Sequence, residues 1–474
     1  MTTIQIWIAA GVGCYMAMML GVGFWASKKV NNTADYIVAG RRLPLWMAVG
    51  TTFATWFGAE TCMGSSGTAY HKGLLGVIID PFGAALCLIL TGLFFARTLY
   101  RLNMETIVDF FDQRFGQTFG KLSAALYIPV YMGWIGGQLL AFGIILETLT
   151  GLPRMPSVLI ATAVVLIYTY SGGMWADTVT DVFQMGILLV GFLIMYPMVM
   201  NKLGGFATAK AQIPPDFFHL YPRNASWFDW ANYAQSWMIV GLGSIPAQDL
   251  IQRIFASKNE RVAQASALVS GFMYLTIGLL PVLLGIFGRL IVPAEKGDSV
   301  LIELILGSLP APLIALMVGA LLSAIMSSAD SAILSPASII GNNLMPYFKK
   351  GVDDKTKLAW CKFSVPVIGI GSLLLALYFQ NIYKLCQEAW TLMLVSLVVP
   401  LVAGLYWKRA TGPGAVASAL AGVASWILLT LTMPENYPHK LFAFLISAAA
   451  MAALSLLGPQ SKQVGARPGV PAVA

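Results

Sequence analysis

Charged side chains are scarce in this sequence. Only 11% of the 474 residues are Asp, Glu, Lys or Arg, whereas 58% are hydrophobic. A soluble globular domain carries about 25% charged residues, so this composition excludes an ordinary soluble domain. Apolar runs long enough to cross a bilayer recur along the whole chain, which is typical of a polytopic membrane protein.

Histidine and cysteine are also rare. The three histidines (His71, His219 and His439) fall at expected loops, and no nucleophile constellation accompanies them, so we do not expect an enzyme. The five cysteines stand in or beside apolar runs without the spacing of a metal site, and we interpret them as small apolar residues. They are Cys14, Cys62, Cys87, Cys361 and Cys386.

The apolar runs predict an all-α membrane protein with about 13 transmembrane helices. The first 26 residues lack a basic start and an evident cleavage site, so we expect the first run to be a true span. The expected spans cover residues 5–26, 46–69, 74–96, 122–149, 157–171, 178–200, 229–254, 264–291, 311–341, 359–379, 384–407, 413–432 and 438–457.

Lys and Arg are unevenly distributed over the predicted loops. If the N-terminus lies outside, basic residues favour the cytoplasmic side by about two to one, with Arg253, Lys258 and Arg261 among them. This predicts a multi-pass protein of the plasma (inner) membrane with the N-terminus outside and the C-terminus in the cytoplasm. We attribute the net charge of +8 to inner-leaflet anchoring, and we expect no nucleic-acid partner.

One apolar run is unusually polar. Residues 318–343 read VGALLSAIMSSADSAILSPASIIGNN. At helical spacing Ser327, Asp330 and Ser331 share one face, and Ser328 is rotated from Ser327 by about 100° toward a second site. An acid at membrane depth costs about 3 kcal/mol, and oxygen ligands suit a hard cation. This pattern favours an ion site, although small residues that permit close helix packing explain the serines equally well.

Two spans contain helix-breaking residues near their centres. The run 46–69 holds Gly50, Gly58 and Gly64 together with Glu60. Unwound backbone at membrane depth is tolerated where it lines a cavity, so carbonyls near residues 54–58 are candidate ion ligands. Glu60 is either a substrate group or a structural acid bonded to backbone amides.

The second interrupted span holds Gly241, Gly243, Ser244 and Pro246. Two broken helices in comparable positions indicate inverted repeats with a binding site between them. We therefore expect an N-terminal helix with a basic connector (1–45), a first repeat (46–200), an outer loop (201–228), a second repeat (229–407), two C-terminal helices (408–457) and a cytoplasmic tail (458–474).

Further acids stand inside or at the ends of predicted spans. Asp80 precedes Pro81 and is either a substrate group or the outer end of a helix. Asp177 is expected to be a helix-start acid favoured by the helix dipole, and Asp181, one turn deeper, is the better ion candidate. We add Gln138, Gln248 and Trp390 as candidate substrate-cavity residues.

Four motifs carry a family resemblance. They are GRRLPLWMAVGTTFAT, GAETCMGSSGTAY, GGMWADTVTDVFQ and ALLSAIMSSADSAILSPAS. Over about residues 5–430 the chain resembles the sodium:solute symporter family, and GLFFARTL and SSADSAILS are most similar to its high-affinity choline transporter branch. The resemblance implies a LeuT-type 5+5 inverted repeat with one extra N-terminal and two extra C-terminal helices.

The resemblance also implies one or two Na+ sites. The site common to the family would use backbone carbonyls of Ala54, Phe57 and Ala324 and the hydroxyls of Ser327 and Ser328. A second site, present in some members, would combine an acid of the TDVFQ run with three side chains of the serine-rich run. Those four residues are Asp181, Ser327, Asp330 and Ser331.

The implied substrate site lies at the first broken helix, with Trp56, Glu60 and Asp80. Trp56 and Trp390 match positions of the aromatic cage that binds a quaternary ammonium in the choline branch. Other cage positions hold Ala84, Gly137 and Ala247, so a different small cationic or zwitterionic solute is favoured.

These observations predict a sodium-coupled secondary active symporter that imports a small organic solute by alternating access. The alternatives are a proton-coupled carrier of the same fold, a solute sensor and a channel. Polar residues concentrated at two breaks and one serine-rich helix favour a carrier over a channel.

Overall fold

The computed structural model describes residues 37–171, 174–348, 351–434 and 436–457, together with single positions between residues 10 and 25. Regular structure in these residues is helical, and one isolated parallel bridge joins Leu43 to Ser257. The expected first span lies largely outside the described residues, and the expected tail, 458–474, lies wholly outside them.

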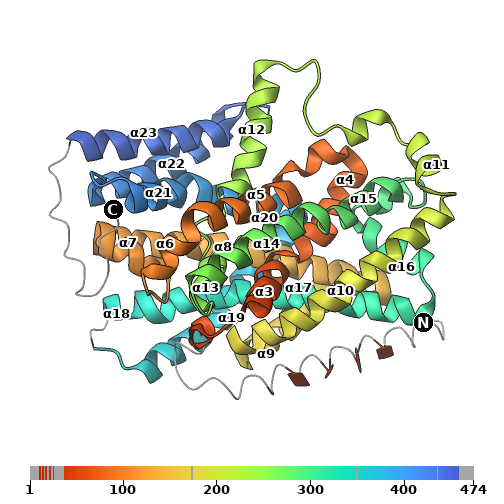
Figure 1. Cartoon of the computed structure of the whole chain (residues 1–474), viewed down its shortest axis with the longest axis horizontal. Helices are drawn as coiled ribbons and strands as arrows, with labels where there is room; N and C mark the ends of the chain where they lie inside the picture. Colours follow the sequence, from red (N-terminus) through yellow and green to blue (C-terminus); the bar gives the residue numbers. More distant parts are fainter. Residues whose placement is uncertain are drawn as a thin grey trace.

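The helices lie side by side in a single bundle (Figure 1). In chain order they are η1 (Ala39–Arg41), α3 (Leu45–Trp56), η2 (Glu60–Gly64), α4 (Ser65–Lys72), η3 (Leu74–Val77), η4 (Ile78–Gly83), α5 (Ala84–Leu90), η5 (Thr91–Phe95), α6 (Ala96–Arg101), α7 (Ile107–Phe115), α8 (Gln117–Thr150), α9 (Arg154–Ser171), α10 (Met174–Lys202), α11 (Phe206–Ala211), η6 (Pro215–Phe218), α12 (Trp227–Gly241), α13 (Gln248–Ala256), α14 (Glu260–Thr276), α15 (Leu279–Gly288), η7 (Ala294–Ser299), α16 (Val300–Ser308), α17 (Ala311–Ile339), η8 (Ile340–Leu344), α18 (Met345–Phe348), α19 (Asp354–Phe379), α20 (Ile382–Met393), η9 (Leu394–Val398), α21 (Val399–Tyr406), α22 (Gly412–Thr432) and α23 (His439–Leu457).

Nine helical stretches of the described residues are long and apolar enough to cross a membrane. Each coincides with an expected span, and a tenth, shorter apolar stretch (Arg154–Ile167) coincides with the short span expected at 157–171. The two remaining expected spans, 46–69 and 229–254, are the ones that contain helix breakers. An all-helical membrane protein is therefore confirmed.

Both breaks occur where glycine and proline predict them. The first helix stops at Trp56, because Phe57 leaves helical geometry (φ −77°, ψ 55°), and helical structure resumes at Glu60. The second helix stops at Gly241, passes through turns at residues 242–247, and resumes at Gln248. The backbone between the two halves of each helix is buried in the bundle.

Close packing explains why glycine stands at the first break. A Cβ atom on Gly58 would lie 2.3 Å from Ser328 Oγ and 2.8 Å from Gln138 Oε1. The amide oxygen of Gln138 on α8 also accepts a hydrogen bond from the Ala59 N–H at 2.9 Å. This bond satisfies a buried backbone donor at the break, and α17 closes against the same point.

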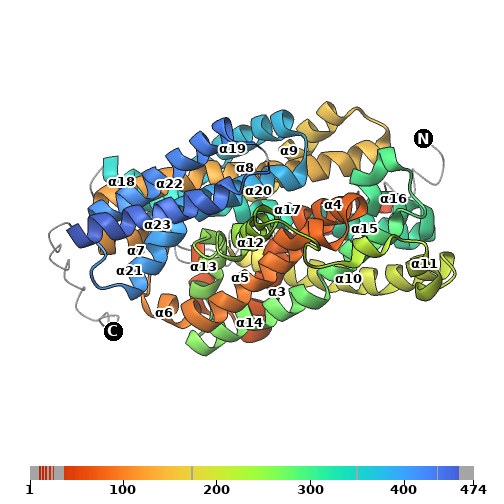
Figure 2. The ribbon, with the colours of Figure 1, turned by 90° about the horizontal axis from the view of Figure 1, so that it is seen from above.

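The last two helices form a hairpin along one side of the bundle, while α3, α10 and α14 lie on the other (Figure 2). The hairpin is joined to the bundle by buried polar contacts. Lys440 Nζ of α23 lies 2.9 Å from Glu388 Oε1 of α20. The side-chain oxygen of Gln235 on α12 accepts hydrogen bonds from the backbone N–H groups of Lys440 and Leu441.

Candidate functional site

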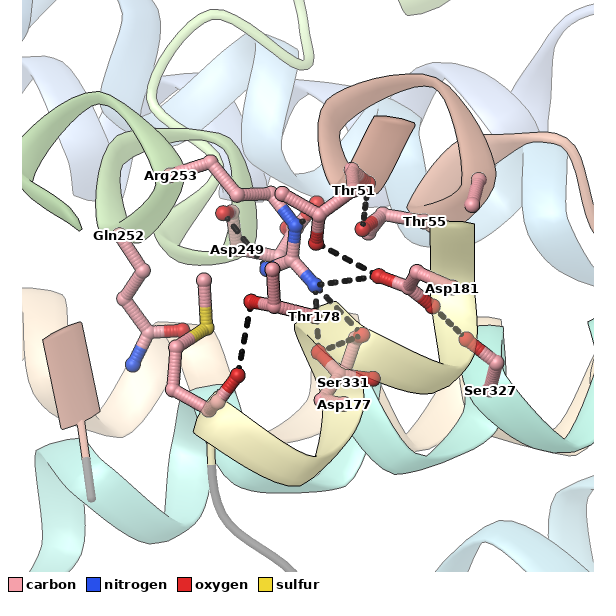
Figure 3. A network of polar contacts seen from close by, with 12 residues as sticks. Thr51, Thr55, Asp177, Thr178, Asp181, Asp249, Gln252, Arg253, Ser327 and Ser331 are labelled. Atoms are coloured by element: carbon pink, nitrogen blue, oxygen red, sulfur yellow. Dashed lines mark hydrogen bonds and ion pairs between the residues drawn. The ribbon is translucent and has the colours of Figure 1, made fainter. Parts of the chain in front are cut away.

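A buried arginine lies on α13, the helix that follows the second break. Arg253 of α13 is 1% exposed, so its expected place in a cytoplasmic loop is wrong. Its Nη2 donates to Asp177 Oδ2 at 2.7 Å and to Ser331 Oγ at 2.6 Å (Figure 3). Because α12 ends at Gly241, the chain restarts as a separate helix inside the bundle and carries the arginine with it.

The guanidinium of Arg253 reaches two backbone carbonyls as well. Nη1 donates to the carbonyl of Asp249 at 3.1 Å, and Nε donates to the carbonyl of Thr51 on α3 at 3.4 Å. Asp181 Oδ2 lies 3.9 Å from Nη2. One side chain therefore contacts residues of α3, α10, α13 and α17.

Asp177 stands in the first turn of α10, as expected for a helix-start acid. Its partner is not apparent from the sequence: Asp177 is fully buried and forms an ion pair with Arg253. Ser331 donates to the same carboxylate oxygen at 2.7 Å. Ser331 is thus engaged with Asp177 and Arg253, and no hydrogen bond joins it to Asp181.

Asp181 joins α10 to two other helices. Thr51 Oγ1 donates to its Oδ2 at 2.6 Å, and the hydroxyl of Ser327 donates to its Oδ1. The carboxylate, the Thr51 hydroxyl and the Ser327 hydroxyl form an oxygen cluster from α3, α10 and α17. Such oxygens are suitable ligands for a hard cation.

Asp330 lies on the same helix as Ser327 and Ser331 and is fully buried. Neither of its carboxylate oxygens has a hydrogen-bond partner among the described residues, and the hydroxyl of Thr169 on α9 is likewise unpartnered. Asp177 and Asp181 are close enough to interact electrostatically with Asp330. The carboxylate of Asp330 makes no ion pair with Arg253, but Arg253, the Thr169 hydroxyl and the two other acids all lie close enough to act on it.

A second oxygen cluster lies at the first break. Ser328 Oγ donates to the carbonyl of Ala54 at 3.3 Å. Phe57 is the residue at which the helix unwinds, and Ala324 lies one turn before Ser328 on the same face of α17. The structure thus brings Ala54 and Ser328 together. Phe57 follows Ala54 by three residues, and Ala324 precedes Ser328 by four.

Three tryptophans and two acids form an adjoining cluster. Trp390 Nε1 donates to Glu60 Oε2 at 3.0 Å, and Trp56 Nε1 donates to Asp249 Oδ2 at 2.6 Å. The ring of Trp390 lies 6.1 Å from that of Trp56 and 5.1 Å from that of Trp134. Glu60 Oε1 is buried and has no partner among the described residues.

Asp80 lies next to this cluster. Ser65 Oγ donates to Asp80 Oδ1 at 3.2 Å and also lies 3.2 Å from the backbone oxygen of Glu60. The Asp80 N–H donates to the hydroxyl of Tyr383 at 3.3 Å. Tyr383 in turn borders a surface hollow that Arg154 and Asp298 also line.

The two expected glutamines have different surroundings. Gln138 lies at the first break, where it accepts the Ala59 N–H. Gln248 does not join the acids and tryptophans, because its side-chain oxygen accepts the backbone N–H of Ile107 at 2.8 Å. Gln248 instead fixes the start of α7 against the second break.

Several residues of the network were not expected from the sequence. They include Thr51, Arg253 and Asp249, whose carboxylate also accepts the hydroxyl of Tyr131. The available signal was the spacing of Asp249 and Arg253, which are four residues apart and therefore share one face of α13. Two opposite charges on the buried face of a half-helix indicate a polar partner across the bundle.

A bundle of membrane-length helices, with two helices broken around buried oxygen clusters, defines a membrane transporter. The chain matches the sodium:solute symporter family over residues 36–422 and belongs to that family. The family expected from the sequence motifs is thereby confirmed. Its members are transporters of small solutes, for which sodium is the coupling ion.

Among its relatives, the human high affinity choline transporter 1 is 28% identical over 89% of this chain and 76% of its own length. The sodium/glucose cotransporter of Vibrio parahaemolyticus is 27% identical over 93% of this chain and 89% of its own length. A solved structure of a Na+-coupled sialic acid symporter shares the fold, with a TM-score of 0.83 at 19% identity, and the match covers 98% of this chain and 100% of that one.

We expect Arg253→Met to lower thermal stability strongly. Removing one partner of a buried ion pair typically costs about 3–5 kcal/mol, because the other charge is left uncompensated. Arg253→Met combined with Asp177→Leu should recover part of this loss, because Asp181 still lies beside the vacated position. The melting temperature of the purified protein in detergent measures both effects.

Arg101→Met is the matched control. Its side chain is 59% exposed and pairs with Glu260 at 2.7 Å, so its loss should cost less than about 1 kcal/mol. If the double variant is no more stable than Arg253→Met alone, the ion pair does not determine the stability of this site.

Proposed function

We propose that this protein is a sodium-coupled secondary active symporter that imports a small organic amine by alternating access. The observation that carries the proposal is the pair of neighbouring hydroxyls on α17. Ser328 reaches the carbonyl of Ala54 at the first break, and Ser327 reaches the carboxylate of Asp181 on α10. One helix thus supplies oxygens to two adjoining clusters.

The first proposed Na+ site is the cluster at the first break. Its ligands are the carbonyls of Ala54, Phe57 and Ala324 and the hydroxyls of Ser327 and Ser328. The second site centres on Asp181, with Ser327 and the added hydroxyl of Thr51. Because Ser331 is bonded to Arg253, it would become a ligand only after the guanidinium moved.

The proposed substrate cavity lies beside the first site. Glu60 offers an unpartnered carboxylate oxygen, and Trp56 and Trp390 offer aromatic faces close to it. A protonated amine is stabilised by both kinds of group. Asp80 lies on the Tyr383 side, so a solute arriving through the hollow beside Tyr383 would meet Asp80 first.

The order of the helices also supports the alternating-access part of the proposal. Each half of the chain has one broken helix followed by four helical stretches, which is the arrangement of a 5+5 inverted repeat over residues 46–200 and 229–407. The proposal also includes about 13 membrane spans, an N-terminus on the outer side and a location in the plasma (inner) membrane. Sodium bound between α3 and α17 would hold the two halves together before the bundle rocks inward.

Sodium should stabilise the protein more than potassium does, because a ligand that binds the folded state raises its stability by mass action. Ser327→Ala removes a ligand shared by both proposed sites and should raise the Na+ concentration needed for half of the effect about tenfold. Melting temperatures over a NaCl series at constant ionic strength give this value.

Ser364→Ala is the control, since Ser364 is buried on α19 and its hydroxyl donates to the Cys361 carbonyl on the same helix. It should leave the Na+ response unchanged. Equal stabilisation by both salts in the wild-type protein, with no effect of Ser327→Ala, would exclude sodium coupling at these residues.

A solute screen in NaCl should find stabilisation by molecules with a protonated amine, and not by sugars or monocarboxylates. Glu60→Gln should abolish that response while the response to Na+ persists, because Glu60 belongs only to the proposed amine site. Glu295→Gln, an exposed acid, is the control. If only uncharged solutes stabilise the protein, the amine assignment is wrong.

A second candidate function, proton coupling, is favoured by Asp330. A buried ionised carboxylate without a partner is very costly, so a cation or a proton must neutralise it. If Asp330 carries a proton that Na+ displaces, addition of NaCl to a weakly buffered sample should release about one proton per chain. Indicator-dye absorbance measures this release.

Asp330→Asn keeps the size of the side chain but holds no exchangeable acid proton, so the release should disappear in this variant. Sodium stabilisation without proton release in the wild-type protein would assign Asp330 to cation binding alone. Proton release that persists in Asp330→Asn would place the proton on another residue.

A further inference from the structure

An apolar groove lies outside the polar network, on the membrane-facing surface. It has a volume of about 410 Å³ and is bounded by α5, η5, α21, α23 and the unwound stretch after α12. Its walls include Phe94, Leu242, Ile245, Val402 and Phe444. The side chains that line the groove do not fill it. The groove can therefore hold a molecule from outside the chain.

The groove has a fixed wall at one end. The hydroxyl of Tyr406 donates to the carbonyl of Phe94 at 2.5 Å, and its ring packs against Phe95 with 5.8 Å between centroids. The hydroxyl of Tyr406 is therefore already used, and its ring presents an apolar surface. Contacts between η5 and α21 hold the two sides of the groove in place.

The groove opens toward the hydrocarbon region of the bilayer. Phe94, Val402 and Tyr406 are 59%, 38% and 50% exposed, and they belong to stretches that are long and apolar enough to span. In that environment an apolar groove contacts lipid acyl chains, which match it in polarity.

Basic residues follow both walls at one end. Arg97 comes three residues after Phe94, and Lys408 and Arg409 come two and three residues after Tyr406. All three side chains are exposed. Arg97 interacts electrostatically with Glu260, and no salt bridge within 4.0 Å joins any of the three to another described residue. Basic side chains at a membrane surface attract anionic lipid headgroups and contribute about fivefold each to affinity.

We propose that this groove binds one anionic phospholipid, with an acyl chain against Leu242 and Ile245 and the phosphate at Arg97, Lys408 and Arg409. Leu242 and Ile245 belong to the unwound stretch between α12 and α13. A bound acyl chain therefore packs against the second break, eleven and eight residues before Arg253. The lipid is thus a ligand of the unwound stretch that leads into α13 and its buried arginine.

The test compares phosphatidylglycerol with phosphatidylcholine, added to delipidated protein in detergent. Native mass spectrometry should show one phosphatidylglycerol retained per chain, and the melting temperature should rise more with phosphatidylglycerol than with phosphatidylcholine. Replacement of Arg97, Lys408 and Arg409 by Gln should weaken phosphatidylglycerol binding by on the order of a hundredfold. Val402→Trp fills the groove and should prevent retention of either lipid.

The control variant replaces Lys121, Lys355 and Lys362 by Gln, which removes the same charge on α8 and α19 without touching the groove. It should bind phosphatidylglycerol as the wild-type protein does. Equal retention of both lipids, or retention that survives Val402→Trp, would overturn the proposal. So would a dimer that Val402→Trp dissociates, because a second copy of the chain would then cover the groove. The assay needs no sodium and no transported solute, so it is independent of the proposed function.

Discussion

The guanidinium of Arg253 is buried inside the helix bundle, and the surrounding helices supply its hydrogen-bond and ion-pair partners. Two carboxylates, a serine hydroxyl and two carbonyls surround it, from α3, α10, α13 and α17. A buried ion pair adds little net stability, but its loss is expensive, so it acts mainly as a constraint on geometry. The relative positions of the two broken helices depend on this contact.

The charges around Arg253 do not balance. Asp177 and Asp181 lie beside one arginine, the Asp249 carboxyl interacts with it electrostatically, and Asp330 interacts electrostatically with Asp177 and Asp181. Trp56 and Tyr131 donate hydrogen bonds to Asp249, which partly compensates its charge. The remaining negative charge makes this region attractive to small cations, and the oxygen clusters at Ala54 and Asp181 lie within the same group of helices.

Local sequence determined most of what could be predicted. Gly58 and the run from Gly241 to Pro246 disfavour helix, so residue type indicated where both helices break. The pairing of Arg253 with Asp177 joins residues 76 positions apart, and it exists only because the second break carries α13 into the bundle. The partner of Gln248 could not be predicted for the same reason. The turn of the chain after the break directs its side chain to Ile107, and helix periodicity does not reveal that direction. Whether Ser331 faces a cation or an arginine also could not be read from helix periodicity.

The contacts of the C-terminal hairpin have a consequence for how the chain is made. The side-chain oxygen of Gln235 accepts two backbone N–H groups from the start of α23, and Glu388 is paired with Lys440 on the same turn. Gln235, near the start of the second half, and Glu388, near its end, thus take their partners from a hairpin that follows both halves in the chain. A chain stopped after α21 would contain every helix of the two halves and still leave these groups unsatisfied. The bundle is therefore completed only after the hairpin has been synthesised, and the hairpin is not a separate appendage.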